Sequence, residues 1–191
     1  MSPSSASPSQ LDGSSLDEHN NPINNLLESV NFDEMDAVAI LAWAAQNFSA
    51  ERVVLNTSLQ MAGVAMIHLA ATAHLPIRIA TIDTLRLPQE TYAFLRELEE
   101  RYDIDIEVQR PDPEKVKRMV RRFGEFLFFD GKHLQEHCCQ VRKVFPNNEL
   151  MKTADCWISG VRRDQSELRR ETPKGTSVTE YGSSRRIMRL N

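Results

Sequence analysis

Short apolar segments alternate along the chain with segments whose apolar residues recur at helical spacing. The strand-like segments are 52–55, 77–82, 104–108, 156–160 and 186–190. The helix-like segments between them are 33–48, 64–71, 88–102, 113–123 and 132–143. Strands and helices that alternate over short connections favour a parallel sheet with helices on both faces. The sequence therefore predicts an α/β fold built on a parallel, doubly wound sheet.

The beginning of the chain has a different composition from the rest. Residues 1–31 are acidic and rich in Ser, Pro and Asn, a composition that buries too little apolar surface to offset chain entropy. We therefore expect a disordered leader over 1–31 and one folded domain over 32–191. Residues 1–51 contain eight Asp and Glu and no Lys or Arg, which argues against a secretory signal or a transit peptide.

Charge and cysteine content restrict the possible ligands and the compartment. The 140 residues after Glu51 hold all 23 Lys and Arg and 19 of the 27 acids, a net charge of +4 that fits a small anionic ligand better than nucleic acid. No apolar run approaches the roughly 20 residues that span a bilayer, so we expect no membrane association. Three cysteines, two of them adjacent, form no secreted-type disulfide framework, and a reducing cytoplasm is the expected location.

Polar residues follow three of the predicted strands, where ligands of doubly wound sheets bind. The first group, Thr57, Ser58, Gln60 and Gly63, joins a strand to a helix and could surround phosphate or sulfate with N–H donors. An ordinary loop with a helix cap is the alternative.

The other two strand ends carry cations. Asp83, Thr84 and Arg86 could hold a nucleoside and face an anion, or could form a simple turn before the next helix. The third group consists of Arg162, Arg163 and Ser166. It could bind an oxyanion by bidentate contacts, or could be a solvated charge run.

The adjacent cysteines Cys138 and Cys139 lie in a predicted helix with His133 and His137. Thiolates are the usual ligands of iron–sulfur clusters. Neighbouring helical cysteines point about 100° apart, which suits a multi-iron cluster better than one tetrahedral zinc ion. A cluster, a zinc site and an inert buried pair all remain open on the residues alone.

In combination, these segments resemble the assimilatory adenylylsulfate/phosphoadenylylsulfate reductase family over residues 33–190. The most specific matches are Asp83-Thr84-x-Arg86-Leu87-Pro88-x-Glu90-Thr91-Tyr92, Cys138-Cys139-x-x-Arg142-Lys143 and the run from Trp157 to Ser166. The resemblance implies a sheet of the adenine-nucleotide α-hydrolase type, which is Rossmann-like. It also implies reduction of adenosine 5′-phosphosulfate, or of its 3′-phosphorylated form, to sulfite and AMP or PAP.

The family's known chemistry implies roles for particular residues and partners. Lys143 matches a basic residue between cluster and substrate, and Cys138 and Cys139 match half of the ligands of a 4Fe–4S cluster. Such a pair marks the branch that prefers adenosine 5′-phosphosulfate. A tail cysteine attacks the sulfate sulfur, and thioredoxin or glutaredoxin then releases sulfite. A homo-oligomer is possible.

The chain departs from the family pattern at several points. Leu85 stands where Gly is usual, and His137 replaces a basic residue. A second Cys-x-x-Cys and the tail nucleophile do not occur before Asn191, so we expect a C-terminally incomplete domain without reductase activity or a stable cluster by itself. Cys156 falls in a strand, and we expect it to be inert. A non-catalytic domain that binds an adenine nucleotide is the alternative function.

Overall fold

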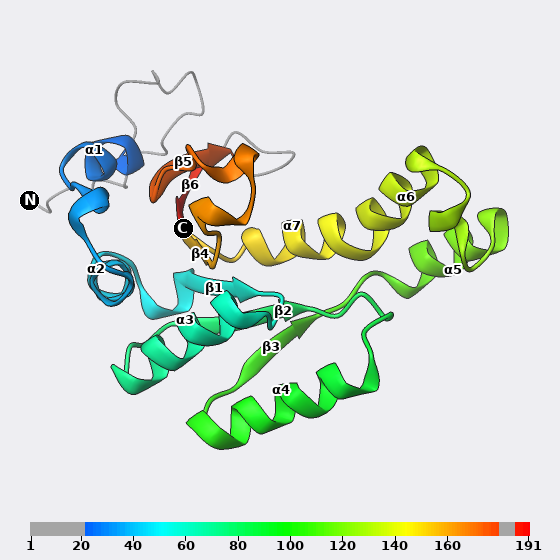
Figure 1. Cartoon of the computed structure of the whole chain (residues 1–191), viewed down its shortest axis with the longest axis horizontal. Helices are drawn as coiled ribbons and strands as arrows, with labels where there is room; N and C mark the ends of the chain where they lie inside the picture. Colours follow the sequence, from blue (N-terminus) through cyan, green and yellow to red (C-terminus); the bar gives the residue numbers. More distant parts are fainter. Residues whose placement is uncertain (1–21, 180–185) are drawn as a thin grey trace, which may run out of the picture.

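The computed structural model describes residues 22–179 and 186–191. Its six-stranded sheet has the order β3-β2-β1-β4-β6-β5, and all neighbouring strands are parallel except β5 and β6 (Figure 1). The strands are β1 (Val53–Thr57), β2 (Arg78–Ile82), β3 (Ile106–Gln109), β4 (Cys156–Ser159), β5 (Gly175–Thr179) and β6 (Arg186–Leu190). The predicted α/β fold is therefore confirmed, with a sheet that is mostly parallel and not parallel throughout.

The helices are α1 (Pro22–Glu28), α2 (Ala37–Asn47), α3 (Met61–Thr72), α4 (Gln89–Tyr102), α5 (Pro113–Phe123), α6 (Lys132–Cys139) and α7 (Phe145–Met151). Among the described residues, none of these helices is long and apolar enough to cross a membrane. Short 3-10 turns occupy Phe32–Glu34, Ala50–Arg52, Leu127–Phe129, Arg163–Gln165 and Glu167–Arg169, and a π-helical segment spans Gln140–Val144.

Alternating side chains of the strands divide the core into two layers. Val53 and Leu55 of β1 pack with α2 and α3 in the larger cluster, whereas Val54 packs with Leu150 and Met151 of α7 on the opposite face. Successive strand residues point to opposite faces, so a strand buried on both sides is apolar throughout. This explains why Val53-Val54-Leu55 reads as a continuous apolar run.

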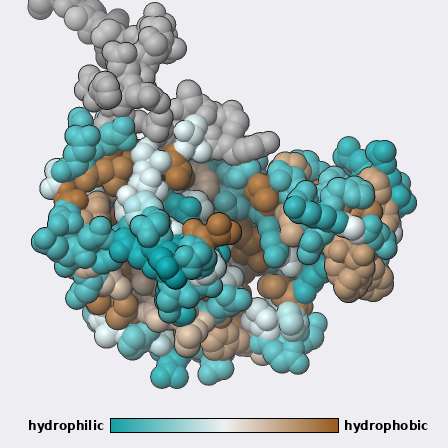
Figure 2. Space-filling view, turned by 45° about the horizontal axis from the view of Figure 1, so that its top comes forward, coloured by the Kyte–Doolittle hydropathy of each residue, from teal (hydrophilic) through white to brown (hydrophobic). Residues whose placement is uncertain are grey.

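A helical arm projects from the sheet between β3 and β4. It contains α5 and α6, and α7 continues it back to the sheet (Figure 1). The arm has its own small core, in which Met119, Leu127, Cys138 and Val141 are buried. In Figure 2 most of the visible surface is hydrophilic, with hydrophobic patches scattered over body and arm.

Three expectations from the sequence need correction. The segment 22–28 forms α1 within the expected leader, because Leu26 and Leu27 pack on the core; the rest of the expected leader, 1–21, lies outside the described residues. Strand β5 was not predicted, and it makes the edge of the sheet antiparallel. The helix expected to stop at 143 continues to Met151 through the π-helical segment, which accommodates Pro146 and its missing N–H.

Candidate functional site

A cavity of about 690 Å³ opens where the strand order reverses between β1 and β4. Loops that follow β1, β2 and β4 line it on one side, and the π-helical segment with the start of α7 lines it on the other. The reversal separates the crossover helices and leaves a crevice at the carboxyl ends of the strands. Seven residues singled out in the sequence line this cavity: Thr57, Ser58, Gln60, Gly63, Thr84, Lys143 and Arg162.

The turn from β1 into α3 is so closely packed that position 63 accepts only glycine. The Leu59 N–H donates to Thr57 Oγ1 at 3.0 Å, and Leu59 itself has a positive φ of 58°. A Cβ added at Gly63 would lie 1.9 Å from Thr57 Oγ1, so only glycine fits there without movement. The first turn of α3 is thereby held against the end of β1, with Gln60 to Gly63 lining the cavity.

The N-terminus of α3 lacks a capping side chain. Its N-cap residue is Gln60, and no side-chain hydrogen bond caps the first turn. The first backbone N–H groups of a helix have no partners within the helix and carry partial positive charge. Because Met61, Ala62 and Gly63 line the cavity, this helix end favours an anion there.

Two cations in the cavity wall have no carboxylate partner among the described residues. Lys143 reaches the cavity from the π-helical segment, and Arg169 from the second 3-10 turn after β4. Arg162 also lines the cavity, but its Nε lies 2.9 Å from Asp164 Oδ1. Lys143 and Arg169 are therefore the cations whose charge is available to a ligand. Sequence reasoning missed Arg169, although it follows Ser166 by only three residues.

The remaining wall is uncharged. Ile82, Leu87 and Val144 contribute apolar surface, and Asn56 Nδ2 donates to Asn147 Oδ1 at 2.7 Å across the cavity wall. Asn56 and Asn147 were also missed, because the contact joins residues 91 positions apart. The cavity thus combines cations and a helix N-terminus with apolar and amide surface, which suits a ligand with an anionic end and a planar, neutral end.

Comparison with known proteins decides the family. A family model described as the phosphoadenosine phosphosulfate reductase domain matches residues 52–188 of this 191-residue chain. The chain belongs to this family. The matched range contains all three loops of the cavity and the cysteine pair, and it confirms the resemblance seen in the sequence.

Named relatives are similar over part of their length. The chain is 32% identical over 140 residues to an adenosine 5′-phosphosulfate reductase of Agrobacterium fabrum, covering 73% of this chain and 52% of that protein. It is 32% identical over 158 residues to the enzyme of the same name from Allochromatium vinosum, covering 83% and 59%. The chain therefore spans about half the length of these curated relatives.

A solved structure shows the same fold. The phosphoadenylyl-sulfate reductase of Candida auris, crystallised as a phosphate complex, superimposes with a TM-score of 0.68 at 20% identity, covering 93% of this chain and 79% of that one. At this level of identity the likeness establishes the architecture alone.

Asp83 does not line the cavity, although it follows β2 directly. Its side chain is 3% exposed, and its carboxylate accepts from the Leu85 N–H, the Tyr92 hydroxyl and Arg110 Nε. Burial by itself would raise the pKa of Asp83, but the three donors outweigh it and lower that pKa. Asp83 therefore supports the turn from within, and Leu85 adopts a φ of 59° there without glycine.

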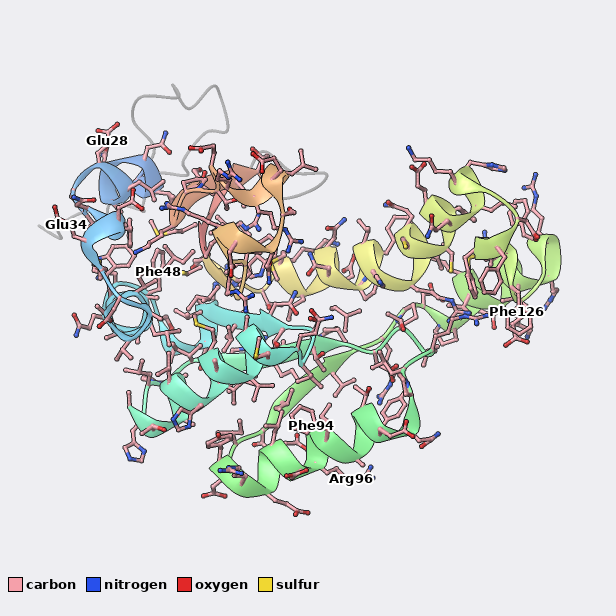
Figure 3. All side chains as sticks on the ribbon, viewed as in Figure 1. Glu28, Glu34, Phe48, Phe94, Arg96 and Phe126 are labelled. Atoms are coloured by element: carbon pink, nitrogen blue, oxygen red, sulfur yellow. The ribbon has the colours of Figure 1, made fainter. Side chains whose placement is uncertain are left out.

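Arg86 also lies outside the cavity lining. Its guanidinium turns to the arm, where it donates to the Glu125 carbonyl and lies over the rings of Phe126 and Phe128, at 5.5 and 4.9 Å from their centroids. Figure 3 labels Phe126 in this arm, well away from the strands. Cation–π contact and a carbonyl acceptor occupy the side chain that we expected to face an anion.

Arg163 and Ser166 are the other two expected site residues outside the lining. Arg163 donates to Asp33 Oδ1 at 2.7 Å and to the Thr172 carbonyl at 3.0 Å, so its charge is paired. The structure thus separates neighbouring arginines that look equivalent in the sequence. Arg162 turns toward the cavity, and Arg163 turns toward the segment before α2.

The cysteines differ in exposure. Cys138 is buried in the arm core, Cys139 is exposed, and Cys156 is buried in β4. Burial raises the pKa of Cys156 to about 12, so its thiol stays protonated, as expected for an inert residue. No group of three His, Cys, Asp or Glu side chains that could hold a metal occurs in 22–179 or 186–191. The described residues therefore do not complete a zinc or a cluster site.

Proposed function

We propose that this domain binds adenosine 5′-phosphosulfate, or its 3′-phosphorylated form, and belongs to a reductase that converts it to sulfite and AMP, or PAP, in sulfate assimilation. The supporting observation is the cavity at the strand reversal, which presents a helix N-terminus and, within the described part of the chain, two cations without a carboxylate partner, next to apolar surface. The relatives named adenosine 5′-phosphosulfate reductase support the same substrate class.

The two ends of the cavity suit the two ends of such a nucleotide. Lys143, Arg169 and the start of α3 would offset the charges of the phosphosulfate, with Thr57, Ser58, Gln60, Gly63 and Arg162 around them. Ile82, Leu87 and Val144 would contact the adenine face, and Thr84 would bond the nucleoside. In this proposal Asp83, Arg86, Arg163 and Ser166 act indirectly, by holding the turns that carry the lining residues.

The chemistry requires a thiolate nucleophile. In the proposed reaction a thiolate attacks the sulfur of the sulfate, the bond from sulfur to the phosphate oxygen breaks, and AMP leaves. A thiol of thioredoxin or glutaredoxin then attacks the S-sulfonate, which releases sulfite and leaves a disulfide. None of Cys138, Cys139 and Cys156 lines the cavity. The nucleophile must therefore come from outside the residues described.

An iron–sulfur cluster belongs to the same proposal. Cys138 and Cys139 would supply two of the four thiolates of a 4Fe–4S cluster, and the other two would come from elsewhere in the protein. One feature fits an anionic group near the pair. Arg142 is 6% exposed and donates from Nη1 to the Thr84 carbonyl at 2.8 Å, but its buried Nε has no hydrogen-bond partner among the described residues. A buried guanidinium without a carboxylate is costly unless an anion compensates it.

Binding of AMP to this chain tests the site. We expect measurable affinity by calorimetry, and we expect Lys143→Ala combined with Arg169→Ala to weaken it at least tenfold, since each removes a charge-assisted contact of about 1.5 kcal/mol or more. Lys152→Ala is the control, because Lys152 is a surface cation just after α7 and pairs with Glu149. If AMP does not bind, or if the double variant binds as well as the original chain, the proposed site is wrong.

A non-catalytic nucleotide-binding domain is the alternative function. It is favoured by the lack of a thiol in the cavity lining. Sulfite release from adenosine 5′-phosphosulfate, measured with thioredoxin or glutaredoxin on the protein with all its cysteines, separates the two. For this chain by itself we predict binding without sulfite. A cytoplasmic location, which suits free thiols, and assembly into a homo-oligomer remain predictions.

A further inference from the structure

Gln165 holds two cationic residues of the cavity at once. Its Oε1 accepts the Arg162 backbone N–H at 3.3 Å and also accepts from the Arg169 guanidinium. Arg162, Gln165 and Arg169 all line the cavity, on the loop that follows β4. One amide oxygen therefore connects two successive 3-10 turns, Arg163–Gln165 and Glu167–Arg169, at the cavity wall.

The neutrality of this acceptor matters for the charge of the cavity. An amide oxygen orients a guanidinium but leaves its positive charge available, whereas a carboxylate at the same place would cancel most of it. The adjacent residue shows the contrast. Asp164 pairs with Arg162 at 2.9 Å, and the bond from Arg162 lowers the pKa of Asp164, so this carboxylate is ionised and offsets the charge of Arg162.

The electrostatic surroundings of Arg169 include a second cation, Arg189. Arg189 lies over the Trp157 ring at 4.8 Å, and its Nε donates to Asn191 Oδ1 at 3.1 Å. The pKa of Arg189 is lowered by burial and, to a smaller extent, by the charge of Arg169. Among the described residues, Arg169 thus bonds a neutral amide and has no carboxylate within ion-pair distance.

We propose that Gln165 is the positioning residue of the anion end of the cavity: it aims Arg169 at the charged group of the nucleotide without neutralising it. This inference rests on the proposed function, because it takes the ligand to be an anionic adenine nucleotide. Gln165 acts through Arg169 and the Arg162 main chain, and it favours charged over uncharged ligands. AMP should depend on Gln165, and uncharged adenosine should not.

Four variants of the full chain test this, with AMP and adenosine as ligands in calorimetry at low and moderate salt. Gln165→Glu keeps an acceptor oxygen but adds a carboxylate beside Arg169. Gln165→Met removes the acceptor at similar size. Asp164→Asn removes the carboxylate that offsets Arg162. Gln135→Glu makes the same chemical change on the exposed face of α6, outside the cavity, and controls for net charge.

The substitutions at positions 164 and 165 should change AMP affinity in opposite directions. Gln165→Glu should weaken AMP binding about fivefold or more and reduce its salt dependence, and Gln165→Met should weaken it about threefold. Asp164→Asn should strengthen AMP binding about twofold, because it frees Arg162. Gln135→Glu should leave AMP affinity within twofold. Adenosine affinity should stay within twofold for all four variants.

Three outcomes would overturn the inference. Gln165→Glu could bind AMP as well as the original chain, which would mean that any acceptor at this position suffices. AMP and adenosine could lose affinity equally, which would mean that Gln165 only maintains the shape of the loop. If the original chain binds neither ligand, the proposed function fails and this inference fails with it. If the original chain binds AMP and the Gln165 variants bind it with the same affinity, only the inference is refuted.

Discussion

Gly63→Ala should loosen the turn from β1 into α3 and weaken nucleotide binding. The added Cβ would lie 1.9 Å from Thr57 Oγ1 and 2.9 Å from Thr57 Cβ, whereas ordinary contacts begin near 3.4 Å. Gly63 and Thr57 are both buried, and each belongs to a regular element that fixes its backbone; turning the Thr57 hydroxyl away would break its bond from the Leu59 N–H. The start of α3 must therefore move away from the end of β1 by about 1.5 Å, a shift comparable to the overlap itself.

The expected cost follows from two opposing effects. Overpacking of this severity costs about 3 kcal/mol, the upper end of the usual range. Alanine in place of glycine in a helix recovers about 1 kcal/mol. The net loss of unfolding free energy is about 2 kcal/mol, which lowers the urea midpoint by about 1 M for a typical slope. AMP affinity should fall as well, because the N–H groups of the first turn of α3 move with it.

Urea unfolding and AMP calorimetry on three variants isolate the contact. Thr57→Ala by itself loses the bond from the Leu59 N–H, about 1 kcal/mol, but in the Gly63→Ala background it also removes the nearest overlapping atom. The double variant should therefore be more stable than the sum of the single effects by about 1 kcal/mol. Gly124→Ala is the control: its φ is +83° and no atom lies within 4 Å, so stability should fall while AMP affinity stays unchanged.

A simple result would refute this reasoning. If Gly63→Ala unfolds at the same urea concentration as the original chain and binds AMP equally well, the turn has more room than the geometry indicates. Strict additivity of the Thr57 and Gly63 effects would equally contradict the proposed contact, since coupling is the signature of two groups that touch.

Two further predictions concern titratable groups. Asp83→Asn should cost about 2 kcal/mol of unfolding free energy, because it weakens the hydrogen bonds that the buried carboxylate accepts. Burial opposes the ionisation of Asp83, but the donors Leu85, Tyr92 and Arg110 hold the pKa of Asp83 below the usual 3.8. The stability from Asp83 is therefore present above about pH 4 and is lost as the pH falls through its lowered pKa, so unfolding curves from pH 2 to 7 should be flatter for the variant. Cys139 should react with a thiol reagent in the native protein near pH 8, and Cys156 only after unfolding, because burial raises the pKa of Cys156 to about 12; equal rates would contradict the structure.

Most helices and strands could be read from the sequence in their correct order, but not all of them, and their ends were not always placed correctly. The helix Pro113–Phe123 and the strand Arg186–Leu190 have the predicted bounds, since Asp112 caps the former and the latter is a short run rich in apolar residues. Strand β5 was missed because Gly175, Thr176 and Ser177 carry little apolar signal. It forms by antiparallel pairing with β6, a contact between segments that the local pattern does not connect.

The site was predicted in part for a similar reason. Residues at strand ends were found because the carboxyl edge of a parallel sheet collects them, and Thr57, Ser58, Thr84 and Arg162 do line the cavity. Arg169 was missed because two short 3-10 turns bring it back to the cavity. Such turns leave no periodic trace in a sequence.

From its sequence alone, the chain could be placed in a family and an α/β fold, because strand and helix patterns and short motifs are local properties. Only the tertiary structure decided which polar groups face the cavity. Arg163 pairs with Asp33, Arg86 bonds to the arm, and Asp83 accepts from three donors, so these side chains do not face the cavity. The Arg169 side chain bonds only the neutral Gln165 among the described residues, and its charge remains available to a ligand. The physical reason is that a charged side chain pairs with whatever long-range contacts bring near it, and sequence neighbours do not reveal that partner.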